Sequence, residues 1–311
     1  LPVAFVLYGK YGKNVATSTR AMQEIHKISG LTHRHPLAQS ACGIYVSIAC
    51  HILNGETIPM SVHDGVEKAL AWYSRHSRFL RIVDTWNNLA FVARRDEASI
   101  RSGGYVVETL ETALWCLLRT ENYEDCVLKC VNMGYDTDST AAVAGGLAGL
   151  YYGYDAIPQE WVSLLAGKEI IEDCVQGLER YCMEHHLMPE APPHNLDDIR
   201  RADRWSHWNT ALDQKATVKN RDKFLGCLIG GAAGDALGYA VEFLTENEIL
   251  FRYGKKGISG YHLQDGLARI SDDTQMTLFA ANGLLVGQTL GCLRGIMAPY
   301  PDYVAQAFQV W

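Results

Sequence analysis

The chain has 311 residues, of which 48% are hydrophobic and 20% charged, so it can bury one large core or two ordinary ones. Its net charge of −7 and the absence of a Lys/Arg stripe argue against binding to a nucleic-acid backbone. We find no run of 18 apolar residues and no signal-peptide pattern, so we expect neither a membrane span nor a leader.

Helical spacing of apolar residues begins early and continues along most of the chain. Between residues 61 and 75 a stripe follows Ser61, a candidate N-cap, and it consists of Val62, Val66, Ala69, Leu70 and Tyr73. Residues 104–119 and 122–134 repeat the pattern, and the second segment stops at Gly134, a typical C-terminal signal. Strand-like alternation is absent. The pattern predicts an all-α fold, a compact domain of many helices.

Nine cysteines are scattered along these segments without CxxC pairs. Their odd number and their apolar surroundings favour free buried thiols in a reducing compartment, so we expect a cytoplasmic protein. Cys126 and Cys130 lie one helical turn apart and could touch zinc. No second pair of soft ligands accompanies them, which favours packing in the core.

A first acidic motif lies at residues 136–139, where Asp136, Asp138 and Ser139 precede a segment of small residues. Such a segment predicts a helix packed closely at the centre of the fold. Carboxylates at the N-terminus of this helix would be partly desolvated, which is costly unless a cation balances their charge. By itself the motif is equally typical of an Asx-turn followed by an N-cap.

Residues 185–223 interrupt the helical pattern with prolines, charges and tryptophans. We predict a connector, at least partly ordered, between two helical blocks at 1–184 and 224–311 of a single domain that spans 1–311. The glycine-rich segment 231–238 opens the second block. It matches neither a dinucleotide-binding fingerprint nor a Walker loop, so its glycines indicate close helix packing.

A second acidic motif, Ser271-Asp272-Asp273, precedes another apolar run. Asp272 followed by Gln275 fits a capping box, and acids are favoured at a helix N-terminus. The alternative is a cation site, because the motif offers only hard oxygen ligands. The four aspartates of the two motifs carry a charge that two divalent cations would neutralise. The pair of motifs therefore predicts a two-metal site for Mg²⁺ or Mn²⁺.

Five segments together resemble the ADP-ribosylglycohydrolase family, which includes the dinitrogen-reductase-activating glycohydrolase and the ADP-ribosyl-arginine and ADP-ribosyl-serine hydrolases. These segments are residues 31–39, 102–115, 133–153, 224–243 and 270–278. The resemblance implies an all-α fold with two Mg²⁺ or Mn²⁺ ions that releases ADP-ribose from an ADP-ribosylated protein or small molecule.

The resemblance also implies roles for single residues. Ser271, Asp272 and Asp273 match the family's Thr-Asp-Asp metal motif, and Asp136, Asp138 and Ser139 match its second metal motif. Glu242 matches the active-site glutamate, so Glu242 and Asp273 are the expected catalytic residues. An ordinary solvated helix residue is the alternative for Glu242.

Four further residues are expected to bind the substrate. Asp235 is the acid of the family's Gly-Asp-Ala-Leu-Gly motif, and His33 matches the Thr-His pair of the ADP-ribose pocket. Gly104 and Tyr105 match a Gly-aromatic contact near the adenosine. The alternatives are a surface loop for His33 and a place in the core for Tyr105.

The chain also departs from the family pattern. Ser271 replaces threonine, and Tyr135 replaces a glycine before the second metal motif. The motifs that normally open the chain come last, which indicates a circular permutation. The loop that normally joins the halves and helps to hold the phosphates is missing, and a partner chain could supply it. We expect Leu1 and Trp311 to lie near the rim of the metal site.

We therefore expect a metal-dependent hydrolase that cleaves the glycosidic bond at the anomeric carbon of ADP-ribose. The acceptor could be arginine, serine, a nucleobase or an acetyl ester. Two alternatives stay open from the sequence: a non-catalytic ADP-ribose-binding or structural relative, and a two-metal phosphoesterase.

Overall fold

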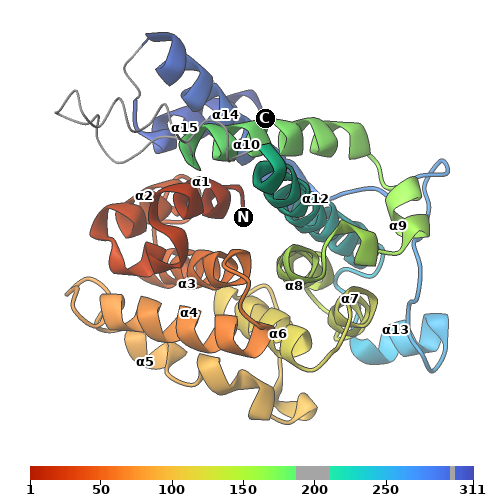
Figure 1. Cartoon of the computed structure of the whole chain (residues 1–311). Helices are drawn as coiled ribbons and strands as arrows, with labels where there is room; N and C mark the ends of the chain where they lie inside the picture. Colours follow the sequence, from red (N-terminus) through yellow and green to blue (C-terminus); the bar gives the residue numbers. More distant parts are fainter. Residues whose placement is uncertain (187–209, 295–297) are drawn as a thin grey trace, which may run out of the picture.

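The computed structural model describes residues 1–186, 210–294 and 298–311, and no β-strand occurs among them (Figure 1). This confirms the predicted all-α fold. Short 3₁₀ helices occur at Gly12–Thr17, Leu89–Arg94, Glu97–Ser99 and Tyr154–Ala156. The α-helices are α1 (Pro2–Tyr11), α2 (Thr19–Ser29), α3 (Pro36–Leu53), α4 (Ile58–Tyr73), α5 (Val83–Trp86), α6 (Val106–Leu118), α7 (Tyr123–Val131), α8 (Thr137–Tyr152), α9 (Gln159–Leu164), α10 (Lys168–His186), α12 (Thr210–Tyr239), α13 (Glu246–Tyr253), α14 (Asp272–Arg294) and α15 (Tyr300–Val310).

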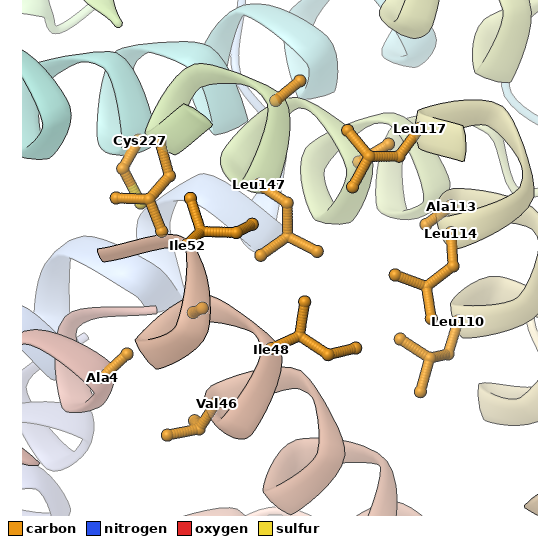
Figure 2. Close-up of a cluster of buried hydrophobic side chains, with 14 of the residues drawn as sticks. Ala4, Val46, Ile48, Ile52, Leu110, Ala113, Leu114, Leu117, Leu147 and Cys227 are labelled. Atoms are coloured by element: carbon orange, nitrogen blue, oxygen red, sulfur yellow. The ribbon is translucent and has the colours of Figure 1, made fainter. Parts of the chain in front are cut away.

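The apolar stripes predicted from the sequence are buried. Figure 2 shows one part of the core, where Ile48 and Ile52 of α3, Leu114 of α6 and Leu147 of α8 lie close together. Every member of the stripe from Val62 to Tyr73 on α4 is also buried. Burial of this apolar surface, at about 25 cal/mol per Å², is the main force that holds the helices together.

The start of α4 differs from the prediction. The helix begins at Ile58 after Thr57, so Ser61 lies in its first turn and is not the N-cap. Pro59 explains the difference, because proline is favoured in the first turn of a helix, where its missing N–H leaves no bond unmade. The Ser61 hydroxyl donates instead to the carbonyl oxygen of Glu56, at 3.4 Å.

Helices α8 and α12 run antiparallel and share the most extensive contact in the described part of the chain (Figure 1). Glycines recur every fourth residue along one face of α12, at 226, 230, 234 and 238, and each lies against α8. A methyl group added at Gly230 would lie 2.7 Å from the carbonyl oxygen of Gly145. Small side chains thus let the two backbones approach closely, as the sequence predicted.

This close approach predicts opposite effects for the same substitution at two glycines. Gly230→Ala should destabilise the protein by about 1–3 kcal/mol, because the neighbouring backbone must move. Gly9→Ala in α1 meets open space and should stabilise by about 0.5–1 kcal/mol through helix propensity. Urea unfolding of both variants measures the difference, and equal effects would contradict the packing described here.

The predicted connector, 185–223, is described only at its two ends, where residues 185 and 186 are the last of α10. Residues 187–209 lie outside the described residues, and residues 210–223 form the first turns of α12. The second helical block therefore begins earlier in the chain than its predicted start at residue 224.

One described helix, α3, has the length and the mean hydropathy, 1.3, of a membrane-spanning segment. Within the fold, however, 67% of this segment is buried. A helix at the centre of a protein core passes the same test of composition, and α3 packs in this way against α1, α4, α6 and α8.

The described cysteines form no disulfide. Cys126 and Cys130 are both fully buried in α7. Burial raises the pKa of the Cys130 thiol well above its usual range, which disfavours the thiolate that zinc requires. The burial and the raised pKa favour core packing over the zinc alternative.

Candidate metal centre

The antiparallel pairing of α8 and α12 brings the start of one helix beside the end of the other. Asp136 directly precedes α8, Asp138 lies in its first turn, and Glu242 follows α12 by three residues. Carboxylate oxygens of these three residues lie within 4.8 Å of one another. Asp138 is only 3% exposed, so its charge sits inside the fold.

The N-terminus of α14 completes this group of acids. The Ser139 hydroxyl donates a hydrogen bond to Oδ2 of Asp273, at 2.8 Å. Asp272 is exposed beside it, and desolvation, together with neighbouring charges that include Asp272, raises the pKa of both Glu242 and Asp273. The two acidic motifs therefore meet in space, as the sequence predicted, although they are 134 residues apart. We call Asp136, Asp138, Glu242, Asp272 and Asp273 the acid cluster.

Ser271, and not Asp272, caps α14. The helix begins at Asp272, and the backbone N–H of Asp273 donates to the Ser271 hydroxyl, at 3.2 Å. The alternative interpretation, a capping box between Asp272 and Gln275, is therefore wrong. Because Ser271 already satisfies the helix end, the carboxylate of Asp272 is free to face solvent or a cation.

Asp235 has a different role from the one predicted. Its side chain is fully buried on α12 and accepts hydrogen bonds from the backbone N–H groups of Ser271, at 3.1 Å, and Thr274, at 3.2 Å. The Thr274 hydroxyl also donates to it. With no exposed surface, Asp235 cannot contact a substrate in this structure. It holds the start of α14 on α12 and so positions Asp272 and Asp273.

The acid cluster has the properties of a divalent-cation site. No Lys or Arg forms an ion pair with any of its five members within the described part of the chain. Desolvation, followed by the neighbouring carboxylates, raises the pKa of Asp138 to about 7 and that of Asp273 to about 6. Hard oxygen donors that repel one another at close range fit Mg²⁺ or Mn²⁺, whose charge removes the repulsion.

Without cations, these raised pKa values predict that stability decreases as pH increases. Between pH 3.8, the ordinary pKa, and about 7, the folded chain holds protons on Asp138 that the unfolded chain has released. Stability is therefore lost as pH rises through this window, at about 1.4 kcal/mol per unit of pKa shift. In EDTA, Tm should fall by at least about 5 °C from pH 5 to pH 8.

Added Mg²⁺ should reverse most of that loss at pH 8, because the cations replace the protons. Thermal unfolding followed by circular dichroism, with and without Mg²⁺ at each pH, makes the comparison. The same slope of Tm against pH in both conditions would show that no cation binds the cluster.

Two residues with positive φ angles hold the cluster's backbone. Tyr135 (φ 63°) precedes Asp136, and Phe243 (φ 65°) follows Glu242. The Tyr135 N–H donates to the carbonyl oxygen of Leu244, at 2.6 Å, and the Phe243 N–H donates to that of Tyr135, at 2.7 Å. Glycine adopts the left-handed conformation of Tyr135 without strain, which agrees with the glycine that the resemblance implies at this position.

The other residues predicted to bind the substrate differ in their position and exposure. A side chain at Gly104 would approach Oδ2 of Asp136 at 3.5 Å, so the loop before α6 borders the cluster. Tyr105 is 53% exposed, which excludes the alternative that it packs in the core. His33 lies exposed in the turn before α3, where its Nδ1 is 3.1 Å from the Thr32 hydroxyl. The substrate-binding roles of these residues stay predictions.

Both ends of the chain lie near the cluster, as expected. Leu1 lines a cavity of about 260 Å³ together with Ser139 and Asp273. The indole N–H of Trp311 donates to Oε1 of Gln275, at 3.0 Å, within the first turns of α14.

A sequence model of a known family matches almost the whole chain. The model, described as ADP-ribosylglycohydrolase, covers residues 1–188 and 216–311. The chain belongs to the ADP-ribosylglycohydrolase family. The match includes every member of the acid cluster as well as Ser139, Asp235 and Ser271.

Individual relatives in the ADP-ribosylglycohydrolase family match about half of this chain. An ADP-ribosylarginine hydrolase Tri1 of Pseudomonas putida is 44% identical over 150 residues, 48% of this chain. Tri1 of Serratia proteamaculans is 33% identical over 147 residues, 47% of this chain. An ADP-ribosyl-[dinitrogen reductase] glycohydrolase of Rhodospirillum rubrum is 30% identical over 135 residues, 43% of this chain.

These matches span only 38%, 37% and 40% of the three relatives' own lengths, respectively. No solved structure gives a significant match. Membership of the ADP-ribosylglycohydrolase family therefore rests on the family model, and the activity of the whole protein is a matter for proposal.

Proposed function

We propose that this chain is a divalent-cation-dependent hydrolase that releases ADP-ribose from an ADP-ribosylated substrate. The observation that carries the proposal is the convergence of five carboxylates, from α8, α14 and the segment after α12, without a cationic partner among the described residues. Family membership and the names of the matched relatives support the same activity.

Asp136, Asp138, Asp272 and Asp273 are the residues that would hold the cations, with the Ser139 hydroxyl as a neutral oxygen ligand. Bound Mg²⁺ or Mn²⁺ would supply positive charge to orient the ribose hydroxyls and to acidify the attacking water. Asp235 contributes indirectly, because its hydrogen bonds to Ser271 and Thr274 fix the direction in which Asp272 and Asp273 leave α14.

Glu242 is the better candidate of the two predicted catalytic carboxylates. Asp273 already accepts a hydrogen bond from Ser139, whereas the Glu242 side chain has no hydrogen bond to any described residue. Desolvation, followed by the charges of Asp136 and Asp272, raises the pKa of Glu242, which makes it a stronger base. Glu242 would take the proton of the water whose oxygen bonds to the anomeric carbon, as the bond to the acceptor breaks.

The acceptor that the relatives favour is arginine, because two of them are named ADP-ribosylarginine hydrolases. The test is incubation with peptides ADP-ribosylated on arginine or on serine, with Mg²⁺ or with EDTA, followed by chromatography of the products. We expect free ADP-ribose from the arginine peptide in Mg²⁺ alone.

The same experiment separates the two alternatives left open by the sequence. Cleaved phosphates in place of ADP-ribose would indicate a two-metal phosphoesterase. The absence of any product from either peptide, despite Mg²⁺ binding, would indicate a non-catalytic relative.

We also infer that the chain is a circular permutation of the family fold. In the resembling family the motifs of α12 and α14 come first, whereas here they follow the motif of α8. Support comes from the packing of α8 against α12, which joins the two blocks into one site. A rearranged chain with residues 210–311 before residues 1–186, which keeps α10 and α12 whole, should fold and bind Mg²⁺ as the parent does; an unfolded product would contradict the inference.

A further inference from the structure

A large cavity lies between the ends of α2 and α4 and the start of α15, and it is distinct from the acid cluster. Its volume is about 950 Å³, within the range of small-molecule sites. Lys27, Arg34, Arg75 and Arg78 line it, and none of its lining residues belongs to the acid cluster. Pro299, Pro301 and Asp302 close the side next to α15.

The four cations of this cavity lack acidic partners. None of them forms an ion pair within the described part of the chain, and Asp302 is the one acid among the lining residues. The chain has 35 acidic and only 28 basic Lys and Arg residues, so unpaired cations are not forced by an excess of positive charge. Such a concentration of cations in an acidic protein indicates a binding site for an anion.

Helix dipoles compensate only part of this charge. α2 ends at Ser29 and α4 ends at Tyr73, both beside the cavity, and each C-terminus carries about half a negative charge. Together with Asp302, they leave about two positive charges without compensation. A role as simple helix caps therefore does not account for all four side chains.

Two of the cations are held in place by the backbone. Arg34 Nε donates to the carbonyl oxygen of Gly30, at 3.1 Å, and Arg78 Nη2 donates to that of Arg34, at 3.0 Å. A guanidinium has five N–H donors, so most donors of each arginine are still available. Preorganised donors reduce the entropy that ligand binding costs.

His26 also lines the cavity and is uncharged at neutral pH. It is buried, and its Nε2 lies 2.9 Å from the Tyr73 hydroxyl. Desolvation first, and then the charges of Arg78 and His76, lowers the pKa of His26 to about 4. The imidazole is therefore neutral at pH 7, and His26 lines the cavity with a polar but uncharged side chain.

We propose that this cavity is a second ligand site, separate from the acid cluster, for a small molecule that carries a diphosphate. The two uncompensated positive charges and the free guanidinium donors match phosphate oxygens in charge and in geometry. The four cations are exposed and surround one open cavity without forming an extended stripe, which favours a small molecule over a nucleic-acid strand. The proposal does not depend on the proposed hydrolase function.

Isothermal titration calorimetry with inorganic pyrophosphate in EDTA tests this site while the acid cluster holds no cation. The variant Lys27→Ala/Arg75→Ala removes two cations whose side chains make no hydrogen bond or ion pair among the described residues, so it should fold normally. We expect wild-type protein to bind pyrophosphate and this variant to bind at least about tenfold more weakly. The matched variant Lys255→Ala/Lys256→Ala, in an exposed loop, should bind like wild type.

Several results would overturn the proposal. Wild-type protein could fail to bind pyrophosphate, or both double variants, with unchanged Tm, could lose affinity equally. Loss of binding in Asp138→Asn would place the pyrophosphate at the acid cluster. Tighter binding of a single-stranded RNA than of pyrophosphate, abolished by Lys27→Ala/Arg75→Ala, would assign the surface to nucleic acid instead.

Discussion

Asp138→Asn should lower kcat by about 10³-fold or more and should abolish Mg²⁺ binding measured by calorimetry. Asp138 is the most buried carboxylate of the acid cluster, and its oxygens face both Asp136 and Glu242. The amide keeps the shape of the side chain but removes the charge that a shared cation requires. The loss of positive charge near the sugar then removes most of the electrostatic stabilisation of the reaction.

Asp155→Asn is the matched control, because Asp155 is exposed at the other end of α8 and belongs to no cluster of acids. Its kcat and Mg²⁺ affinity should equal those of the parent. Mg²⁺ binding and turnover at parental levels in Asp138→Asn would show that the acid cluster is not the metal centre.

Glu242→Gln should lower kcat by about 10²–10⁴-fold, the usual contribution of a general base. Unlike Asp138→Asn, it should retain Mg²⁺ binding, because the four aspartates of the cluster are untouched. The affinity for ADP-ribose should change little. Single-turnover kinetics with ADP-ribosyl-arginine peptide, together with calorimetry, measures the chemical step and the two affinities separately.

Glu246→Gln provides the control, because Glu246 is exposed in the first turn of α13, four residues further along. It should keep the parental kcat. A Glu242→Gln variant that loses Mg²⁺ binding as completely as Asp138→Asn would show that Glu242 is a metal ligand and not the base.

The sequence predicted the helical fold and the meeting of the two acidic motifs for clear physical reasons. Apolar periodicity dictates which face of each helix is buried, and the stripe on α4 illustrates it. Desolvating four aspartates at the N-termini of apolar helices costs free energy unless they converge on a cation. The hydrogen bond from Ser139 to Asp273 is the direct result of that convergence.

Other features depend on the tertiary structure and left no signal in the sequence. Asp235 was expected to contact the substrate, but whether an acid beside glycines faces a pocket or a neighbouring helix end depends on how α12 and α14 pack. Likewise, Lys27 lies in α2 and Arg75 in the turn after α4, and only the folded chain brings them into one cavity. The left-handed backbone at Tyr135 is different, because the glycine that the resemblance implies at this position was an indirect signal for it.

The most direct test of the central claim, that the acid cluster is a two-metal centre, is anomalous diffraction from crystals of this protein grown with Mn²⁺. We predict two strong peaks about 3.5–4 Å apart, the usual spacing of paired catalytic ions. The peaks should lie among the carboxylates of Asp136, Asp138, Asp272 and Asp273. A map without peaks between these side chains, at saturating Mn²⁺, would contradict the metal centre and the function built on it.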